Sequence, residues 1–566
     1  AASDVYKRQL HISLLGMGLY RLLRKRLHTR YVTAALATTV FLISYAVLSG
    51  NGVSTQRAVG MCLIYLFADV TGYAYDMLNA LGIVVLVLLW ENPFLLSYSG
   101  FVFSVMAVIA IGVGANVLLE WEHSWKCRQQ AGEETIKKTF FSRQKEGILV
   151  SFAIQLFTIP LVAYSYYEIP VYAMLINLFV LAVVNGLLGL TVLGVIVGMA
   201  FLPAGRVLFA PCGWMLDSYR FLCEVSLKIP GAQRITGKPA HMRIFWYYLG
   251  LGVFLLAIYA CARRNEKHKD CRETADLCVS RRKKRLQGIV FSCFIAFLLL
   301  FLLFPQKKSF EIDFLDVGQG DGIYLCTGGG TSMFIDGGST DVKQVGKYRI
   351  LPFLKAKGVS EISYWFVSHT DTDHVSGLKE VLVSGYRVEY LVFAKAVEKE
   401  AKTKELAELA RSHGTKVLYM QAGDTVRSKR AAMRCLYPKA SDKAEDVNDL
   451  CLVLQFEEGD ISALFGGDIS TDVEEQLLRR RKWDKVLVFK ADHHGSRYAN
   501  AEALLKCIRP EITVASAGKD NRYGHPSPDA VQRIKESGSR FFCTIEGGRI
   551  RVRVIENKLV CETYVK

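Results

Sequence analysis

The chain has 566 residues, 51% of them hydrophobic, and a mean hydropathy of +0.22, which excludes a single soluble domain. Its net charge of +17 is uneven, because residues 1–304 carry 30 Lys and Arg against 16 Asp and Glu, whereas residues 305–566 carry 40 against 37. Cytoplasmic loops of membrane proteins are enriched in Lys and Arg, so the basic excess does not by itself indicate nucleic-acid binding.

Apolar runs of membrane-spanning length recur through the first 304 residues. A span needs about 20 apolar residues, and the run at 171–202 is long enough for two short spans that turn near Asn185 and Gly186. We expect residues 10–23 to be the tail of an earlier span and residues 1–9 to be a truncation or assembly scar. The predicted spans are 31–48, 58–75, 78–95, 101–119, 148–166, 171–202, 244–260 and 288–304.

Two basic segments, 21–30 and 263–285, set the expected orientation, because loops of this composition stay in the cytoplasm. The number of crossings between them is even if 171–202 crosses twice and 206–242 lies along the surface. The last span then carries the chain outward. The sequence therefore predicts a multi-pass protein of the plasma membrane with an extracytoplasmic C-terminal domain, and a miscount of one span would reverse that orientation.

After Pro305 the pattern changes to short β-rich runs that alternate with helix-like stretches such as 397–413, 470–480 and 501–508. Several of these runs end in clusters of His, Asp and Gly. We expect an α/β fold, an αββα sandwich in which two sheets pack face to face under helices and the polar strand ends form one site.

The stretch "SHTDTDHVSG" (368–377) is the first candidate metal site. His369, Asp371, Asp373 and His374 follow an apolar strand at a spacing that lets several donors converge on one ion. A polar surface loop has the same appearance. The metal interpretation is favoured because five of the eleven histidines fall in this stretch, in "KADHHGS" and in "NRYGHP". Further acidic candidates are Asp336 in "FIDGG" and Asp468 in "LFGGD".

Taken in order, these motifs resemble the ComEC family of competence proteins, which take DNA across the bacterial membrane. The resemblance is carried by "LDVGQGDG", "FIDGG", "SHTDTDHVSG", "GGDIS", "KADHHGS" and "GHPSPDAV", and in the apolar part by "STQRAVGM", "YAYDMLNALG" and "NPFLLSYSGFVFSVMAV". It implies a competence-type transmembrane channel domain at 10–304 and a hydrolase domain of the metallo-β-lactamase fold at 305–566. Family members also carry a small soluble domain that we do not find here, so the chain resembles an N-terminally truncated member.

The expected metal site departs from a complete dinuclear centre at two positions. Asp371 stands where the fold usually has a histidine, and Asn448 stands where another histidine is expected. Oxygen donors suit hard ions, so we expect a divalent metal with Mn²⁺ favoured and Zn²⁺ or Mg²⁺ as alternatives.

Roles follow for the candidate residues. We expect Asp373 and His374 to be the main ligands, His369 and Asp371 to serve a weaker position, and Asp468 to bridge. Either His493 or His494 completes the set. The remaining candidates act on the substrate or on the loops: His525 as proton donor or further ligand, Ser496 and Lys490 as phosphate contacts, Asp336 as the residue that fixes the ligand loop, and Asp316 and Asp321 as orienting groups.

Together these features predict a channel for single-stranded DNA with an outward-facing, metal-dependent nuclease that degrades the other strand. Arg57, Asp76 and Asn79 are polar groups in or beside apolar runs and are candidates for the DNA path, although each would equally cap or pair within helices. Expected partners are duplex DNA outside, a DNA receptor and a cytoplasmic motor. The alternatives are a membrane-anchored hydrolase of a small phosphodiester or lactone, and a DNA channel with a catalytically silent domain.

Overall fold

The structure is a computed structural model that describes residues 15–124, 140–267, 277–305, 308–444, 446–556 and 558–565. The expected scar at 1–9 and the middle of the basic segment 263–285 lie outside the described residues. The chain separates between Phe304 and Pro305 into two units, which are described in turn.

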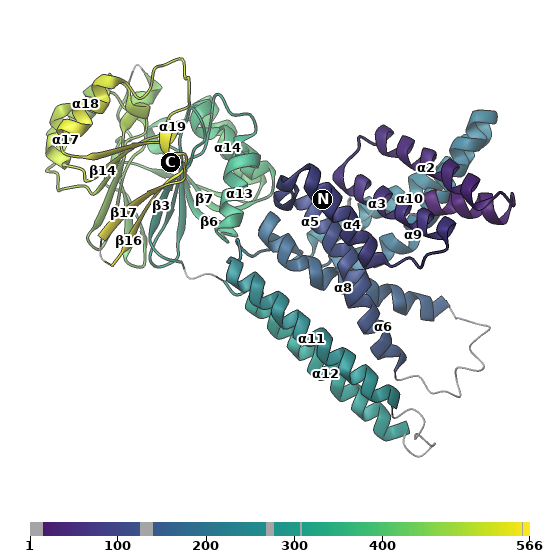
Figure 1. Cartoon of the computed structure of the whole chain (residues 1–566). Coiled ribbons are helices and arrows are strands. Elements are labelled where there is room, and N and C mark those ends of the chain that lie inside the picture. Colours follow the sequence, from purple (N-terminus) through teal and green to yellow (C-terminus); the bar gives the residue numbers. More distant parts are fainter. Residues whose placement is uncertain are drawn as a thin grey trace. The chain divides into compact units, whose positions relative to one another are not determined.

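The N-terminal unit is helical (Figure 1). Five helical segments among the described residues are long and apolar enough to cross a membrane: Tyr31–Leu48, Ser99–His123, Lys145–Tyr166, His241–Asn265 and Arg282–Leu302. The helices of this unit are α2 (Tyr31–Leu48), α3 (Val53–Thr71), α4 (Met77–Glu91), α5 (Ser99–Ile109), α6 (Asn116–His123), α8 (Phe140–Tyr166), α9 (Ala173–Ala200), α10 (Leu202–Lys228), α11 (His241–Lys267) and α12 (Leu277–Leu302). The π-helix η2 (Ala110–Ala115) joins α5 to α6, and the strands β1 (Glu168–Pro170) and β2 (Gln233–Ile235) pair.

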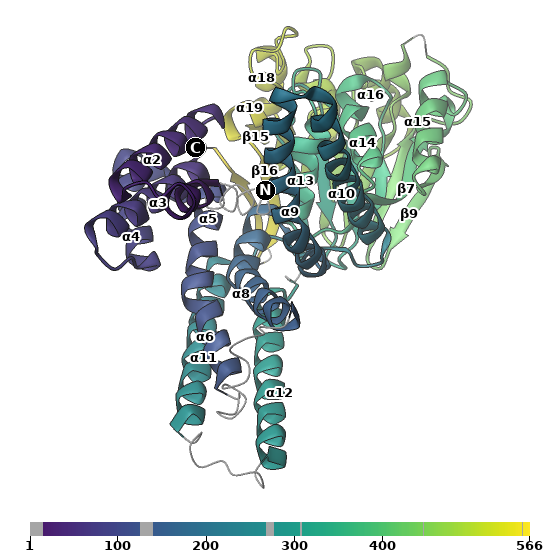
Figure 2. The same cartoon turned by 90° about the vertical axis from the view of Figure 1, so that its right-hand side faces the viewer.

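The predicted turn near Asn185 and Gly186 is wrong, because α9 runs unbroken through both residues. A glycine inside a helix costs only about 1 kcal/mol relative to alanine, which the long apolar run on either side outweighs. The chain reverses instead at Phe201, and α10 packs back along α9 (Figure 2). A Cβ on Gly205 would lie 2.5 Å from the Cα of Gly198, so glycines are needed where these two helices touch.

The C-terminal unit contains an eight-stranded sheet in the order β17-β16-β3-β4-β5-β6-β7-β8. Pairing is antiparallel from β17 to β5 and parallel from β5 to β8. Its strands are β3 (Glu311–Phe314), β4 (Gly322–Cys326), β5 (Ser332–Asp336), β6 (Glu361–Phe366), β7 (Arg387–Ala394), β8 (Lys416–Met420), β16 (Ile550–Ile555) and β17 (Lys558–Thr563).

A seven-stranded sheet, in the order β15-β14-β13-β12-β11-β10-β9, forms the other half of the unit. It is antiparallel from β9 to β12 and parallel from β12 to β15. Its strands are β9 (Thr425–Ser428), β10 (Ala431–Tyr437), β11 (Val453–Glu458), β12 (Ile461–Phe465), β13 (Val488–Lys490), β14 (Ile512–Ala515) and β15 (Arg540–Cys543).

Three apolar cores hold these layers together. The first lies between the sheets and joins residues such as Phe314 and Phe456, both fully buried. The second packs α13 (Leu351–Ala356), α14 (Thr372–Val383) and α15 (Ala401–Ser412) on the eight-stranded sheet, and the third packs α16 (Thr471–Arg480), α17 (Glu502–Ile508) and α18 (Pro528–Glu536) on the seven-stranded sheet. Figure 1 shows the resulting order of helices, sheet, sheet and helices. The predicted αββα sandwich is confirmed.

Candidate metal centre

The motif at 368–377 forms the loop between β6 and α14. Asp371 is the N-cap residue of α14, and Asp373 and His374 lie in its first turn. The loop is fixed from below by Asp336, the last residue of β5, whose Oδ1 accepts the backbone N–H of Ser368 at 2.8 Å. His374 is fully buried, so its ring is held inside the unit and not presented on the surface.

The opposite side of the centre comes from the seven-stranded sheet. Asp468 follows β12, and His493 and His494 follow β13 in a short turn where both have positive φ, +48° and +55°. The N–H of His493 donates to the carbonyl of Gly467 at 2.9 Å, which ties the two loops together. This uncommon backbone conformation turns two consecutive histidines toward the strand ends.

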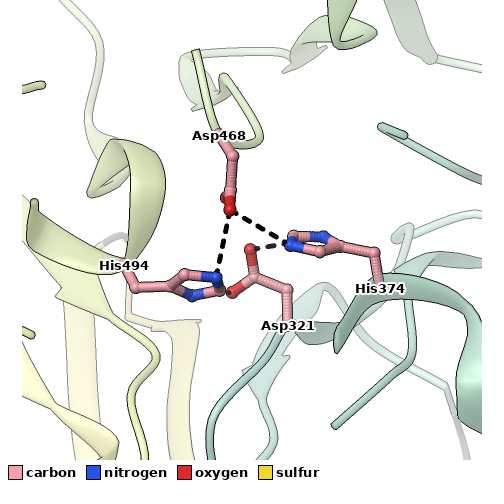
Figure 3. A group of neighbouring side chains, drawn as sticks. All are labelled: Asp321, His374, Asp468 and His494. Atoms are coloured by element: carbon pink, nitrogen blue, oxygen red, sulfur yellow. Dashed lines mark ion pairs between the residues drawn. The ribbon is translucent and has the colours of Figure 1, made fainter. Parts of the chain in front are cut away.

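The side chains of both sheets meet at Asp468 (Figure 3). Its Oδ2 lies 3.3 Å from Nε2 of His374 and 3.2 Å from Nε2 of His494. Oδ2 of Asp373 lies 3.7 Å from the same Nε2 of His494. Two imidazole nitrogens therefore converge on one oxygen of Asp468, and the carboxylate of Asp373 lies beside one of them.

The other ring nitrogens of these histidines are already occupied. Nδ1 of His374 lies 3.0 Å from Oδ2 of Asp336, and Nδ1 of His494 lies 3.0 Å from the carbonyl oxygen of Ser516. Asp321 lies on the same Nδ1 side, 3.9 Å and 3.6 Å from the two rings. Acceptors at Nδ1 fix the proton there and leave the Nε2 lone pairs for an ion, as is usual for metal-binding histidines.

The donor set fits a divalent cation. Nε2 of His374, Nε2 of His494 and Oδ1 of Asp468 are buried without a hydrogen-bond partner, although such groups are normally satisfied. Asp321, His374, Asp468 and His494 each offer a donor atom within 4.8 Å of the others. This buried group indicates a divalent metal site.

The pKa values of His374 and His494 also indicate a site for a cation. Burial opposes the charged form of His374, but Asp468 and Asp336 outweigh it and raise the pKa of His374 well above its usual value. Burial also opposes charge on His494, and Asp468 and Asp321 raise the pKa of His494 to about 9. The negative potential that favours a proton on each imidazole equally favours a cation between them.

A second set of candidates comprises the buried His369 and the partly exposed Asp371 and His493. Nε2 of His369 lies 4.0 Å from Oδ2 of Asp371, and Nε2 of His493 lies 4.0 Å from Oδ2 of Asp468. Asp371 is half-exposed and pairs with Lys402 of α15 at 2.9 Å. The donor atoms of these residues are more widely spaced than those of His374, Asp468 and His494.

Lys490 lies next to Asp321 and Asp468 and is only 1% exposed. Its Nζ pairs with Asp321, lies 3.7 Å from Oδ1 of Asp468 and donates to the carbonyl of Gly467 at 3.2 Å. Burial disfavours the ammonium, but the two carboxylates outweigh it and raise the pKa of Lys490. This placement favours a positioning role over direct contact with a phosphate.

Ser496 and His525 lie in the loops beyond His494. Ser496 is buried, and its Oγ accepts the N–H of Tyr498 at 3.3 Å, so its polar atom stabilises the turn. The ring of His525 lies 5.5 Å from that of His493 and 6.2 Å from that of His494. Burial, with the neighbouring His494 and His493, lowers the pKa of His525 to about 4. His525 therefore lies beside the two histidines but is not part of the buried donor group.

Candidates for a DNA path have local partners in the N-terminal unit. Arg57 on α3 is fully buried, and its Nε donates to Oγ of Ser104 on α5 at 2.6 Å. Asp76 is exposed and caps α4 by accepting the N–H of Asn79 at 2.7 Å. Asp76 and Asn79 therefore form a helix cap, and Arg57 pairs with a side chain of a neighbouring helix.

Two basic runs of the C-terminal unit are largely neutralised by neighbours. Arg549, just before β16, and Arg551 on β16 lie 3.4 Å and 3.3 Å from Oδ1 of Asp313. Arg479 and Arg480 of α16 lie 3.0 Å from Glu475 and Asp442. Their charge is therefore shared with nearby carboxylates.

Comparison with known proteins agrees with the resemblance in the sequence. The family model described as "Competence protein" matches residues 10–260. ComE operon protein 3 of Bacillus subtilis is 25% identical over 562 residues, covering 96% of this chain and 66% of that protein. Recombination protein 2 of Haemophilus influenzae is 24% identical over 589 residues, covering 97% of this chain and 68% of that protein. Residues 10–260 therefore form a domain of the competence-protein family. The chain spans about two thirds of the length of these two relatives, and with its apolar helices it is a membrane protein.

Solved structures with likeness to this chain include the metallo-β-lactamase fold protein YhfI from Bacillus subtilis, with a TM-score of 0.31 and 11% identity over 43% of this chain and all of that one. Zinc-bound PqqB from Methylobacterium extorquens gives a TM-score of 0.29 and 10% identity over 41% of this chain and 87% of that one.

Proposed function

We propose that this chain belongs to the ComEC family and takes one strand of DNA across the plasma membrane, and that its C-terminal unit hydrolyses phosphodiesters of the other strand. The observation that carries the nuclease proposal is the convergence of His374, Asp468 and His494 through unpartnered buried atoms. The transport proposal is supported by the match of residues 10–260 to competence proteins. A hydrolase in the same chain as a DNA channel has the incoming duplex as its nearest substrate.

Within the centre, Asp373, His374, Asp468 and His494 would hold the ion. When bound, a divalent ion supplies an activated water and neutralises charge on a phosphoryl oxygen. Asp336 and the carbonyl of Ser516 keep the imidazoles oriented with Nδ1 protonated.

His525 would serve as a further ligand. Its pKa is lowered to about 4 by burial and by His494 and His493, so near pH 7 its ring is neutral, which is the form that binds a metal ion, and it lies beside the rings of His493 and His494. The half-exposed Asp371 and the neighbouring His369 would serve a second, weaker position at the open side of the site.

We propose Mn²⁺ as the preferred ion. The inner position would draw on the carboxylates of Asp468 and the partly exposed Asp373 and on two imidazoles, and the outer position again pairs one carboxylate with one imidazole. Oxygen donors in this proportion suit a harder ion than an all-nitrogen site does, with Mg²⁺ and Zn²⁺ as the competitors.

For the degraded strand to stay outside, the C-terminal unit at 305–566 would face away from the cytoplasm. The residues at 10–304 would form the channel, and a receptor outside and a motor inside would deliver and pull the strand. Arg57, Asp76 and Asn79 remain candidates for the path only if their helix contacts rearrange around DNA.

The test uses the full chain in detergent with single- and double-stranded DNA and Mn²⁺, Mg²⁺ or Zn²⁺ in turn. We expect Mn²⁺-dependent hydrolysis, lost by orders of magnitude in Asp468→Asn together with bound metal. Asp442→Asn, which changes a partly buried carboxylate that pairs with Arg480, is the matched control and should keep both activity and bound metal. Full nuclease activity in metal-free Asp468→Asn would contradict the proposal.

A further inference from the structure

In the loop that follows β14, the side chain of Asn521 makes four hydrogen bonds to backbone groups of the same loop. Its Nδ2 donates to the carbonyls of Gly518 at 2.8 Å and His525 at 2.6 Å. Its Oδ1 accepts the N–H of Tyr523 at 3.2 Å and of His525 at 3.0 Å. The loop is therefore preorganised, and residues displayed on it do not have to be ordered when a ligand binds.

Tyr523 is displayed at the tip of this loop, with half of its surface exposed. Its ring stacks on His525 at 5.7 Å with an interplanar angle of 23°. His525 in turn stacks on His494 at 6.2 Å and 26°. A series of nearly parallel rings thus leads from the surface to an imidazole of the metal centre.

Arg522 accompanies this tyrosine. Its guanidinium carbon lies 4.9 Å from the centre of the Tyr523 ring, and its Nη2 donates to the phenolic oxygen at 2.6 Å. A planar cation beside an exposed aromatic ring provides both stacking surface and positive charge. Single-stranded nucleic acids are bound by that combination, because each nucleotide offers a flat base and a negative phosphate.

We infer that Arg522 and Tyr523 form a stacking platform for an unpaired nucleobase of the strand whose phosphodiester lies at the metal centre. The inference rests on the proposed nuclease function and names its substrate class. A paired base inside a duplex cannot offer its face to the platform, so the centre would prefer single strands and frayed ends to internal duplex.

The test compares two phosphodiesters on the full chain in detergent with Mn²⁺: a single-stranded oligothymidylate, and methyl 4-nitrophenyl phosphate, which has no base. Tyr523→Leu should lower kcat/KM for the oligonucleotide by about 5- to 150-fold, the range for losing one stacked base. It should leave the small diester unchanged, which also shows that the variant folds. Tyr523→Phe keeps the ring and should behave as wild type on both.

Tyr348 on η5 (Gly346–Ile350) provides the matched control, because it is 63% exposed with Lys347 5.1 Å from its ring centre. Tyr348→Leu should change neither rate. An equal loss on both substrates in Tyr523→Leu, or no loss on the oligonucleotide, would overturn the platform.

If the wild type hydrolyses neither substrate, the nuclease proposal fails, and this result is distinct from a failure of the platform. The platform is then decided by binding, with a single-stranded oligonucleotide carrying the fluorescent base 2-aminopurine and metal-free protein. Stronger quenching by wild type and Tyr523→Phe than by Tyr523→Leu supports stacking. Equal quenching by all three rules it out.

Discussion

Both carboxylate oxygens of Asp336 have a partner. Oδ1 accepts a hydrogen bond from the backbone N–H of Ser368 at 2.8 Å, and Oδ2 lies 3.0 Å from Nδ1 of His374. The last residue of β5 therefore holds both the loop that begins at Ser368 and the ring of His374. Its φ of +58° shows that the backbone is bent out of the strand to do so.

We expect Asp336→Asn to weaken metal binding by about 10- to 100-fold, the usual effect of losing such a partner. If the amide oxygen of the new side chain still accepts from Ser368, its NH₂ faces Nδ1 of His374. That arrangement forces the proton onto Nε2, where it blocks the ion. Isothermal titration of the metal-free protein with Mn²⁺ measures the change.

Asp424→Asn is the control for this substitution, because Asp424 also accepts a backbone N–H, that of Gln421 at 3.0 Å, in a turn before β9. It should leave Mn²⁺ affinity unchanged. Wild-type affinity in Asp336→Asn would show that the ring of His374 is oriented by other contacts.

Lys490→Met should destabilise the C-terminal unit by about 3–5 kcal/mol, because it leaves the buried carboxylates of Asp321 and Asp468 without their cation. The double variant Lys490→Met/Asp321→Asn should recover much of the loss, since one uncompensated charge is removed with its partner. Pulse proteolysis in urea on metal-free protein measures the free energy of unfolding.

Lys506→Met breaks an exposed pair with Glu502 and should change the same free energy by no more than about 0.5 kcal/mol. If the double variant is no more stable than Lys490→Met alone, the lysine stabilises the unit through packing and not through its charge.

Sequence patterns predicted the strands that lead to the centre but not those at the sheet margins. The runs at β4, β5, β13 and β14 are buried along their whole length, because both of their faces are covered. By contrast, "RIRVRVI" became β16, where the arginines alternate with buried Ile550 and Val552 and pair with acidic neighbours.

The candidate site was only partly predictable for a similar reason. His374 and Asp373 could be found because they stand together in one motif, whereas the distinction between His493 and His494 depends on a turn with two positive φ values. Asp321 is 53 positions from His374 in the numbering and comes within 3.9 Å of its ring only when β4 and β6 join one sheet. Its orienting role was expected from the motif, but its inclusion in the buried donor group was not.

A topology prediction follows from the helices of the N-terminal unit. The five segments long and apolar enough to cross among the described residues are odd in number, and four of them precede the basic run that contains Arg282. If these five cross, residues 21–30 stay in the cytoplasm and the C-terminal unit is outside. Alkaline phosphatase fused after Lys566 should be active, and green fluorescent protein at the same place should be dark. The opposite pair of results would place the hydrolase in the cytoplasm and remove its role in degrading the outer strand.

Asp371→His should shift the metal preference of the outer position from Mn²⁺ toward Zn²⁺. Asp371 contributes a carboxylate 4.0 Å from Nε2 of His369, and its replacement by imidazole makes that position richer in nitrogen, which Zn²⁺ favours. We expect Zn²⁺ affinity to rise relative to Mn²⁺ by about tenfold, a change of about 1.4 kcal/mol, measured by competition with a chelator. The substitution also breaks the ion pair with Lys402, so Lys402→Met is the control that breaks the pair without adding a nitrogen. A Zn²⁺ preference that rises equally in Lys402→Met would assign the effect to the lost pair, and an unchanged preference in Asp371→His would show that this side chain does not face the ion.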